Sequence, residues 1–164
     1  MKILVVSDTH GNIVRLKHVL GFAERFSVSA LVHCGDWDNL ETARLMGEVK
    51  IPVYGVLGNA DEAHYNEILG ELKGAGVEVG EVDIIKTEFD GKKVAIGHQP
   101  FRVAEYITKG EFDLVFHGHT HQKKDKFFGK THVINPGAVA NTTLPSFAIY
   151  DTKSDRVEFV DIAI

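Results

Sequence analysis

The sequence predicts an α/β fold in which two mixed β-sheets pack face to face and helices cover their outer faces. In the first half of the chain, apolar strand-like runs alternate with helix-spaced apolar residues, a pattern typical of βαβ units. In the last third, short strand-like runs follow one another directly, as in antiparallel pairing. With 164 residues, 44% of them hydrophobic, the chain can bury a substantial core, and we expect one domain over residues 1–164.

The predicted elements of the first half alternate between strand and helix. Apolar runs typical of strands buried on both faces occupy residues 2–6, 30–32 and 52–57. Apolar residues at helical spacing follow each run, over residues 13–23, 40–46 and 65–72. This order favours a parallel sheet.

The second half is predicted as short strands with one further helix. Strands over residues 82–89 and 93–96 flank Asp90-Gly91-Lys92, which is a hairpin signal. A helix around residues 101–107 precedes a strand over residues 113–116. Phe127-Phe128-Gly129-Lys130 is interpreted as a turn. The remaining strands are expected at residues 133–134, 146–150 and 157–162.

Potential metal ligands are concentrated directly after the predicted strands. The clearest case is the cluster that contains His119 and His121, because residues two apart in an extended segment point to the same side and two imidazoles can converge on one metal. The full set is Asp8, His10, Asp36, Asn59, His98, His119 and His121. Since ligands bind at the carboxyl edge of strands in α/β sheets, we predict that these side chains form one site.

Three carboxylate or amide oxygens and four imidazoles are too many ligands for one tetrahedral zinc. They suit two metal ions about 3.5–4 Å apart that share a carboxylate. Mixed oxygen and nitrogen ligation favours manganese, iron, zinc, nickel or cobalt over the metals of a thiolate site. Such a pair lowers the pKa of a water between the ions and stabilises an in-line displacement at phosphorus.

Five ordered motifs carry a close resemblance to a known family. They are Asp8-x-His10, Gly35-Asp36, Gly58-Asn59-x-Asp61, Gly97-His98 and Gly118-His119-x-His121. Their order resembles the calcineurin-like metallophosphoesterase superfamily, and the chain is similar to its small, single-domain prokaryotic phosphodiesterase branch over essentially its whole length, including Asn135-Pro136-Gly137. The resemblance implies an αββα four-layer sandwich and a metal-dependent phosphodiesterase in which a hydroxide bridging two metals attacks phosphorus in line.

The resemblance also assigns roles to residues. Asp8, His10 and His121 would hold one metal, Asn59, His98 and His119 the other, and Asp36 would bridge them. Asp36, Asn59, Asp61 and His98 are the residues expected to act in catalysis, with Asp61 orienting a histidine ligand. We expect two divalent ions, manganese first, with iron, nickel, zinc, cobalt and magnesium as alternatives.

Two positions depart from the family pattern. Ala60 stands where much of the superfamily has a histidine after the motif asparagine, and Pro100 stands where many members carry a second histidine. No residue is then an obvious proton donor for the leaving group. We therefore predict better turnover of phosphodiesters with acidic leaving groups, such as aryl esters, than of alkyl phosphomonoesters.

Composition narrows the partners. The net charge of -5 does not favour nucleic acid or an anionic membrane, and the basic residues Lys123, Lys124 and Lys126 are interrupted by Asp125. Cys34 is the only cysteine and no apolar run is long enough for a signal or membrane segment, so we expect a cytoplasmic protein. The expected partner is a small phosphate ester, and nucleotide-like compounds are included in this class. The sequence does not decide between a monomer and a homo-oligomer.

Other functions fit less of the sequence. An aspartyl-phosphate mechanism at Asp8 would want a second aspartate where the chain has His10. A single-zinc hydrolase of C–N bonds built on His119 and His121 leaves the other ligands unexplained. A non-catalytic scaffold remains the alternative, since the superfamily includes a trafficking-complex subunit of this size. A scaffold would not need all seven potential ligands, and this chain has all seven, which favours the enzyme. Cys34 and the remaining histidines, at positions 18, 33, 64, 117 and 132, are interpreted as packing or surface residues.

Overall fold

Two mixed β-sheets form the centre of the computed structural model, which describes residues 1–80 and 84–163. The first sheet has the order β11-β10-β1-β2-β3-β4 and the second the order β5-β6-β7-β9-β8. The strands of the first sheet are β1 (Lys2–Val6), β2 (Ala30–His33), β3 (Val53–Gly55), β4 (Glu78–Val79), β10 (Ser146–Asp151) and β11 (Arg156–Asp161). Those of the second are β5 (Ile84–Phe89), β6 (Lys92–Gly97), β7 (Leu114–Phe116), β8 (Lys123–Phe128) and β9 (Thr131–Pro136).

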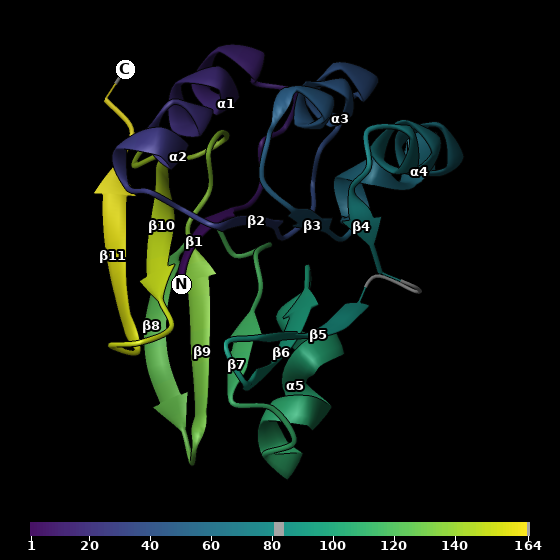
Figure 1. Ribbon diagram of the computed structural model, residues 1–164. Coiled ribbons are helices and arrows are strands. Elements are labelled where there is room, and N and C mark those ends of the chain that lie inside the picture. The colour runs from purple at the N-terminus through teal and green to yellow at the C-terminus, as the bar shows by residue number, and fades with distance from the viewer. Residues whose placement is uncertain (81–83, 164) are drawn as a thin grey trace.

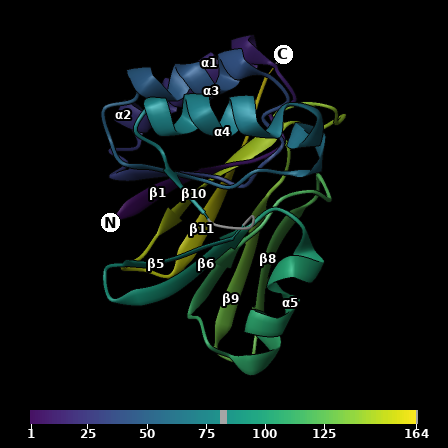
Figure 2. The ribbon, with the colours of Figure 1, turned by 90° about the vertical axis from the view of Figure 1, so that its right-hand side faces the viewer.

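Helices cover the outer face of each sheet, as predicted (Figures 1 and 2). The six-stranded sheet carries α1 (Ile13–Leu20), α2 (Phe22–Arg25), α3 (Leu40–Leu45) and α4 (Tyr65–Gly74). The five-stranded sheet carries α5 (Pro100–Lys109). Short 3₁₀ segments, η1 (Met46–Glu48) and η2 (Asn59–His64), follow α3 and precede α4. The layers therefore run helix, sheet, sheet, helix, which confirms the predicted sandwich.

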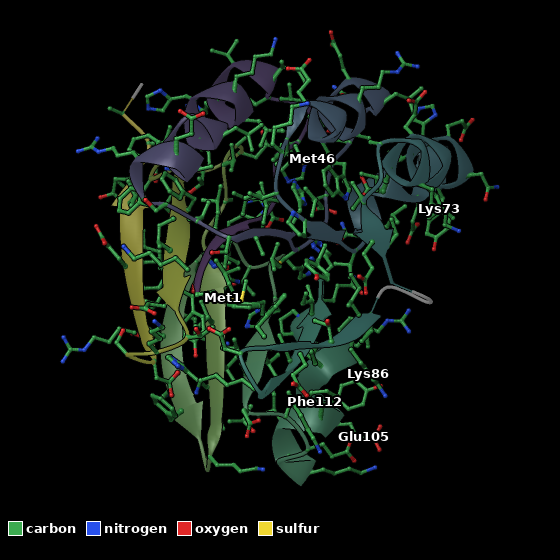
Figure 3. The ribbon with its side chains drawn as sticks, viewed as in Figure 1. Met1, Met46, Lys73, Lys86, Glu105 and Phe112 are labelled. Atoms are coloured by element: carbon green, nitrogen blue, oxygen red, sulfur yellow. The ribbon has the colours of Figure 1, made fainter. Side chains whose placement is uncertain are left out.

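Strand β1 shows why its sequence lacks hydrophobic alternation. Ile3 and Val5 pack in the core between the sheets, whereas Leu4 and Val6 pack in the core between the first sheet and its helices. A third cluster, around Phe112, joins the second sheet to α5. Figure 3 shows Phe112 in this lower layer and Met46 in the upper helical layer. Both faces of the central strands are thus buried, as in parallel sheets generally.

Parallel strands in both sheets bring their carboxyl ends to one rim. In the first sheet, β1 pairs in parallel with β2, and β2 with β3. In the second, β6 pairs in parallel with β7, and β7 with β9. Antiparallel strands complete the sheets at β10, β11, β5 and β8. The loops after β1, β2, β3, β6 and β7 are the ones that hold the predicted ligands.

The structure corrects three local predictions. The helix expected over residues 13–23 is divided at Gly21, a residue of low helix propensity, into α1 and α2. Phe127 and Phe128 end β8 rather than form a turn, since the ring of Phe127 stacks on His132 of β9 at 4.2 Å between centroids. The two-residue edge strand β4 was not expected. Residues 82 and 83 of the predicted strand 82–89 lie outside the described residues.

Candidate metal centre

The structure brings all seven predicted ligands to the rim where the two sheets meet. Loops of the six-stranded sheet supply Asp8 and His10 after β1, Asp36 after β2 and Asn59 after β3. Loops of the five-stranded sheet supply His98 after β6 and both His119 and His121 after β7. The side chains form two groups that share Asp36.

The first group consists of Asp8, His10, Asp36 and His121, whose ligand atoms lie within 4.8 Å of one another. Asp8 Oδ1 is 3.0 Å from His121 Nε2. His10 Nε2 is 3.4 Å from His121 Nε2 and 3.6 Å from Asp36 Oδ2. Two carboxylates and two imidazoles in this arrangement are a ligand set that suits a divalent transition metal.

The second group is built around the side-chain oxygen of Asn59. Asn59 Oδ1 is 2.8 Å from His119 Nδ1 and 3.1 Å from His98 Nε2. His98 Nε2 is also 3.2 Å from Asp36 Oδ1. Asp36 therefore directs Oδ2 towards the first group and Oδ1 towards the second, the orientation that a bridging carboxylate needs.

A buried oxygen of Asp8 that accepts no hydrogen bond from the part of the chain that the structure describes tests whether these residues fit a metal ion. Asp8 Oδ2 accepts hydrogen bonds from Ser7 Oγ at 2.5 Å and from the His119 N–H at 3.1 Å. Asp8 Oδ1 is buried and has no hydrogen-bond partner among the described residues. A buried carboxylate oxygen without a donor is costly, and a bound cation removes that cost. The donor set therefore fits a divalent metal.

Hydrogen bonds to backbone carbonyls fix the orientation of two imidazoles. The Nδ1–H of His98 donates to the Cys34 carbonyl at 2.7 Å, and the Nδ1–H of His121 donates to the Asn141 carbonyl at 3.2 Å. Because a carbonyl only accepts, Nδ1 must carry the proton in each neutral ring. Nε2 is then left with its lone pair directed into the site, as metal ligation requires.

The backbone of the site is strained. Asp8, His10, Asp36, His119 and His121 all have φ angles between 42° and 69°. This left-handed region is sparsely populated by residues other than glycine, and such strain is concentrated at functional sites. Five ligands in that region indicate that the fold holds their side chains against the local backbone preference.

Two motif glycines are required by close packing rather than by φ. A Cβ at Gly58 would lie 2.1 Å from Asp36 Oδ1, and a Cβ at Gly118 would lie 1.9 Å from Ser7 Oγ. Either side chain would displace a ligand or the residue that supports it. The glycines of these two motifs therefore make room for the carboxylates.

The carboxyl groups of Asp36 and Asp8 have pKa values shifted in opposite directions. Burial acts to raise the pKa of Asp36. In the metal-free protein, His98 in its protonated form, with a proton on Nε2 as well as Nδ1, outweighs burial through its hydrogen bond and charge and lowers the pKa of Asp36 to about 2. For Asp8, burial dominates and raises the pKa above the usual range of a carboxyl. Asp36 is thus ionised without any metal, whereas the carboxylate form of Asp8 is favoured by a nearby cation.

The structure corrects the expected role of Asp61. Its carboxylate accepts hydrogen bonds from the N–H groups of Asp38 and Gly58, each at 2.7 Å, and among the residues that the structure describes no histidine hydrogen-bonds to it. The physical reason is its position three residues after Gly58, where its side chain accepts from the Gly58 N–H as in a capping box. The Asp38 N–H reaches the same carboxylate from the loop after β2. Asp61 thereby ties the loop that carries Asp36 to the loop that carries Asn59.

Asn135 supports the histidine loop, which sequence reasoning did not foresee. Its Nδ2 donates to the Gly118 carbonyl at 2.9 Å and to Thr120 Oγ1 at 3.1 Å. The Asn-Pro-Gly motif was the signal, but only the pairing of β7 with β9 places Asn135 beside the loop. Asn135 therefore holds the segment between His119 and His121 in position.

Several residues near the site are structural, as predicted. His33 is buried and stacks on Trp37 at 3.5 Å between ring centroids, and burial lowers its pKa to about 3. Burial likewise lowers the pKa of His117 to about 4. Cys34 is fully buried, and burial raises the pKa of its thiol well above the usual value. These side chains pack beneath the ligands.

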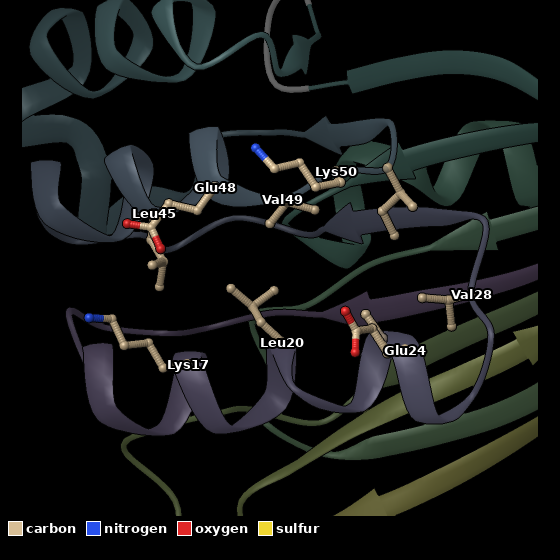
Figure 4. A pocket seen from close by; sticks show the side chains of 10 residues that line it. Lys17, Leu20, Glu24, Val28, Leu45, Glu48, Val49 and Lys50 are labelled. Carbon is tan, nitrogen blue, oxygen red and sulfur yellow. The ribbon is translucent and has the colours of Figure 1, made fainter.

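Two hollows lie in different parts of the molecule. A hollow of about 70 Å³ adjoins the second group and is lined in part by Asn59, His98 and Arg102. A larger one, about 460 Å³, lies between α1 and α3, where Leu20 faces Val49 and Lys17 lies at the edge (Figure 4). The larger hollow contains no imidazole, and its place in the helical layer separates it from the ligands.

Comparison with known proteins gives a consistent result. The Calcineurin-like phosphoesterase superfamily domain matches residues 1–155. The chain is 28% identical to phosphodiesterase MJ0936 of Methanocaldococcus jannaschii over 168 aligned positions, covering all of this chain and 99% of that protein.

Solved structures show the same fold. An archaeal phosphodiesterase superposes with a TM-score of 0.89 at 28% identity, covering 98% of this chain and 99% of that one. The phosphoesterase YfcE of E. coli gives a TM-score of 0.70 at 18% identity over 99% of this chain and the whole of that one. Vps29 of Entamoeba histolytica gives 0.67 at 18% identity over the same shares. The last two likenesses show the fold alone. Among the described residues, no helix has the length and apolar character to cross a membrane.

Proposed function

This chain belongs to the calcineurin-like phosphoesterase superfamily, in its small prokaryotic branch, and we propose that it is a phosphodiesterase that works with two divalent metal ions. The observation that carries the proposal is the arrangement of Asp36, whose two oxygens face two separate ligand groups. The unpartnered Asp8 Oδ1 in the first group supports the presence of a cation there.

In this proposal, each ligand group holds one ion. Asp8, His10 and His121 hold the first ion, Asn59, His98 and His119 hold the second, and Asp36 serves both. Two such ions, when bound, supply an activated water and neutralise charge on a phosphoryl group. We propose manganese as the activating ion, with iron, nickel, zinc, cobalt and magnesium as alternatives.

The residues of the chain position the site and shape its preference for substrates. Carbonyl groups hold His98 and His121 with Nε2 directed inwards, and Asp61 fixes the loops of Asp36 and Asn59. Ala60 contributes only its backbone, whose N–H donates to Asp36 Oδ1 at 2.9 Å. No side chain at that position can protonate a leaving oxygen, so the proposed substrates are phosphodiesters with acidic leaving groups.

A non-catalytic scaffold is the second candidate, because Vps29 shares the fold. The donor set argues against it. A scaffold does not require two adjoining groups of ligand candidates, a carboxylate whose oxygens face both groups, or strained backbones at five of these residues. The presence of these features supports the enzyme. The enzyme is therefore the function that the geometry supports best.

Hydrolysis of bis-p-nitrophenyl phosphate tests the proposal. Metal-stripped protein should be inactive, and adding manganese should restore turnover, while Asp36→Asn should lower kcat/KM by at least about a hundredfold. Asp151→Asn is the matched control, because it changes a carboxylate that accepts from the Lys153 N–H in the turn after β10, where an asparagine oxygen can still accept. Repeating the assay with the other ions ranks them. If manganese binds stoichiometrically and no divalent ion supports turnover, the scaffold is correct.

A further inference from the structure

The small hollow beside the second ligand group lies between the segments that contain Ala60 and Pro100, the two positions where the family pattern has a histidine and this chain does not. Ala60 and Pro100 are not among the lining residues, which include Gly58, Asn59 and Glu62 from one segment and His98, Gln99 and Arg102 from the other. Pro100 is the first residue of α5, where its fixed φ suits the start of a helix. The side chains that this region offers instead are those of Glu62, Tyr65, Gln99 and Arg102.

Arg102 is the positively charged group of this hollow. Its backbone N–H donates to the Gln99 carbonyl at 3.0 Å, so the first turn of α5 fixes where the side chain starts. Within residues 1–80 and 84–163, its guanidinium forms no ion pair, although the protein carries a net charge of -5. An unpaired arginine is ordinary on a protein surface. Arg102 differs in that it lines a hollow together with Asn59 and His98, and its guanidinium carbon lies 5.5 Å from the centroid of the exposed Phe101 ring.

The size and lining of the hollow favour a small polar group. Its volume is about 70 Å³, against about 460 Å³ for the hollow between α1 and α3, and its lining includes Asn59, Gln99 and Arg102. A carboxylate or phosphate group matches such a lining. The guanidinium fork binds such oxyanions through two parallel hydrogen bonds. Glu62, on the other wall, carries the opposite charge and opposes anion binding.

We propose that this hollow is a subsite for a second oxyanion on the substrate and that Arg102 binds it. The substrate class is a phosphodiester in which a group esterified to the scissile phosphate carries a carboxylate or a further phosphate a few bonds away. This inference rests on the proposed phosphodiesterase function and adds the charge that the substrate must carry.

Matched esters with one chromogenic leaving group test the subsite. The substrates are p-nitrophenyl 2-carboxyethyl phosphate, its 2-phosphonoethyl analogue and the neutral 2-carbamoylethyl analogue. With manganese bound, the wild type should show a KM roughly tenfold lower for at least one charged ester than for the neutral one, since a charge-assisted hydrogen bond contributes about 1.5 kcal/mol. The two charged esters distinguish a carboxylate site from a phosphate site.

Variants connect this preference to Arg102. Arg102→Gln should abolish the difference in KM while leaving turnover of the neutral ester within about twofold, and Arg102→Lys should retain part of it. Glu62→Gln should enlarge the difference. Arg156→Gln, at the start of β11 opposite the far end of β10, is the matched control and should behave like the wild type.

The outcomes separate the two proposals. Equal KM values for the charged and neutral esters in the wild type, or a difference that survives Arg102→Gln, would overturn the subsite and leave the phosphodiesterase intact. Absence of turnover of all three esters and of bis-p-nitrophenyl phosphate with every one of the proposed divalent ions would overturn the phosphodiesterase, and the subsite with it.

Discussion

At the scale of single residues, the position of the Asp36 carboxylate depends on Gly58, which has no side chain to displace it. We expect Gly58→Ala to reduce turnover at least about tenfold, because a Cβ at this position lies 2.1 Å from Asp36 Oδ1 and must displace the shared ligand. Gly70→Ala is the control, since a Cβ there has nothing within 4 Å and the residue lies within α4. It should stabilise the protein by about 0.5–1 kcal/mol at unchanged activity. Steady-state kinetics and urea unfolding measure both effects. Full activity in Gly58→Ala would show that Asp36 does not need its observed position.

The buried histidine His33 makes stability depend on pH. Burial lowers its folded pKa to about 3, so the folded protein keeps it neutral while the unfolded chain takes up a proton below about 6.5. Stability should therefore fall as the pH falls, by about 1.6 kcal/mol between pH 6.5 and pH 5 from this residue alone. In the metal-free state, the His33→Asn variant should be less stable than the wild type at pH 7. Its free energy of unfolding should fall less than that of the wild type when the pH is lowered. His64→Asn, at an exposed histidine, should keep the wild-type slope. A slope unaffected by His33→Asn would contradict the assignment.

The ligands themselves could be predicted from the sequence, but their supports could not. Asp8, Asp36 and His119 follow apolar runs directly, so their place at a strand end is a local signal. Asn135 and Asp61 act through backbone groups distant in sequence or set by a 3₁₀ turn. Their hydrogen bonds depend on which strands become neighbours, and single residues carry no signal for that.

At the scale of elements, one histidine ties the two sheets together at the end opposite the metal centre. His132, at the start of β9, is buried between Asp125 of β8 at 2.7 Å and Asp155 of the β10–β11 turn at 3.0 Å. Tyr150 Oη donates to the same Asp155 oxygen at 2.6 Å. Interpreting His132 only as surface or structural underestimated it, because Asp125 and Asp155 are brought to it by strand pairing.

We expect His132→Ala to lower the free energy of unfolding by about 2–4 kcal/mol and to leave kcat/KM for bis-p-nitrophenyl phosphate within about twofold of the wild type. The loss follows from removing the contact to Asp155, which joins the two sheets, and the contact to Asp125 on the neighbouring strand of the same sheet. The distance from the ligands protects activity. Urea unfolding at pH 7 measures the first effect. His18→Ala, at an exposed residue of α1, should change stability by less than about 0.5 kcal/mol. A large loss of activity in folded His132→Ala would mean that the far rim is coupled to the metal centre.

Elements with strong local signals were predicted well. The hairpin at Asp90-Gly91 and helix α5 follow from turn chemistry and apolar spacing, which act within a few residues. Strand β8 has a mostly charged sequence because its side chains are mostly exposed, so it lacks the apolar pattern that predicts a strand. Its structure depends on pairing with β9. The break at Gly21 and the edge strand β4 are equally decided by packing.

At the scale of the whole molecule, the proposed ions join the two sheets. Each ligand group takes side chains from both sheets: Asp8 and His121 in the first, Asn59 and His98 in the second. An ion in either group therefore binds only when the sheets are correctly packed against each other. Metal binding should then stabilise the folded state as a whole.

Unfolding with and without manganese tests this linkage. At a free concentration about 100 times the dissociation constant, manganese should stabilise the wild type by about 2.7 kcal/mol for each independent site. His121→Ala and Asn59→Ala should each bind one ion instead of two and keep about half of this effect, because each variant removes a ligand from one group only. Asp36→Asn should lose most of the stabilisation, since its oxygens face both groups. Titration calorimetry gives the stoichiometry beside the unfolding curves. Equal stabilisation of Asp36→Asn and the wild type would mean that the ions bind independently of Asp36, and the two groups would then be separate sites rather than one centre spanning the sheets.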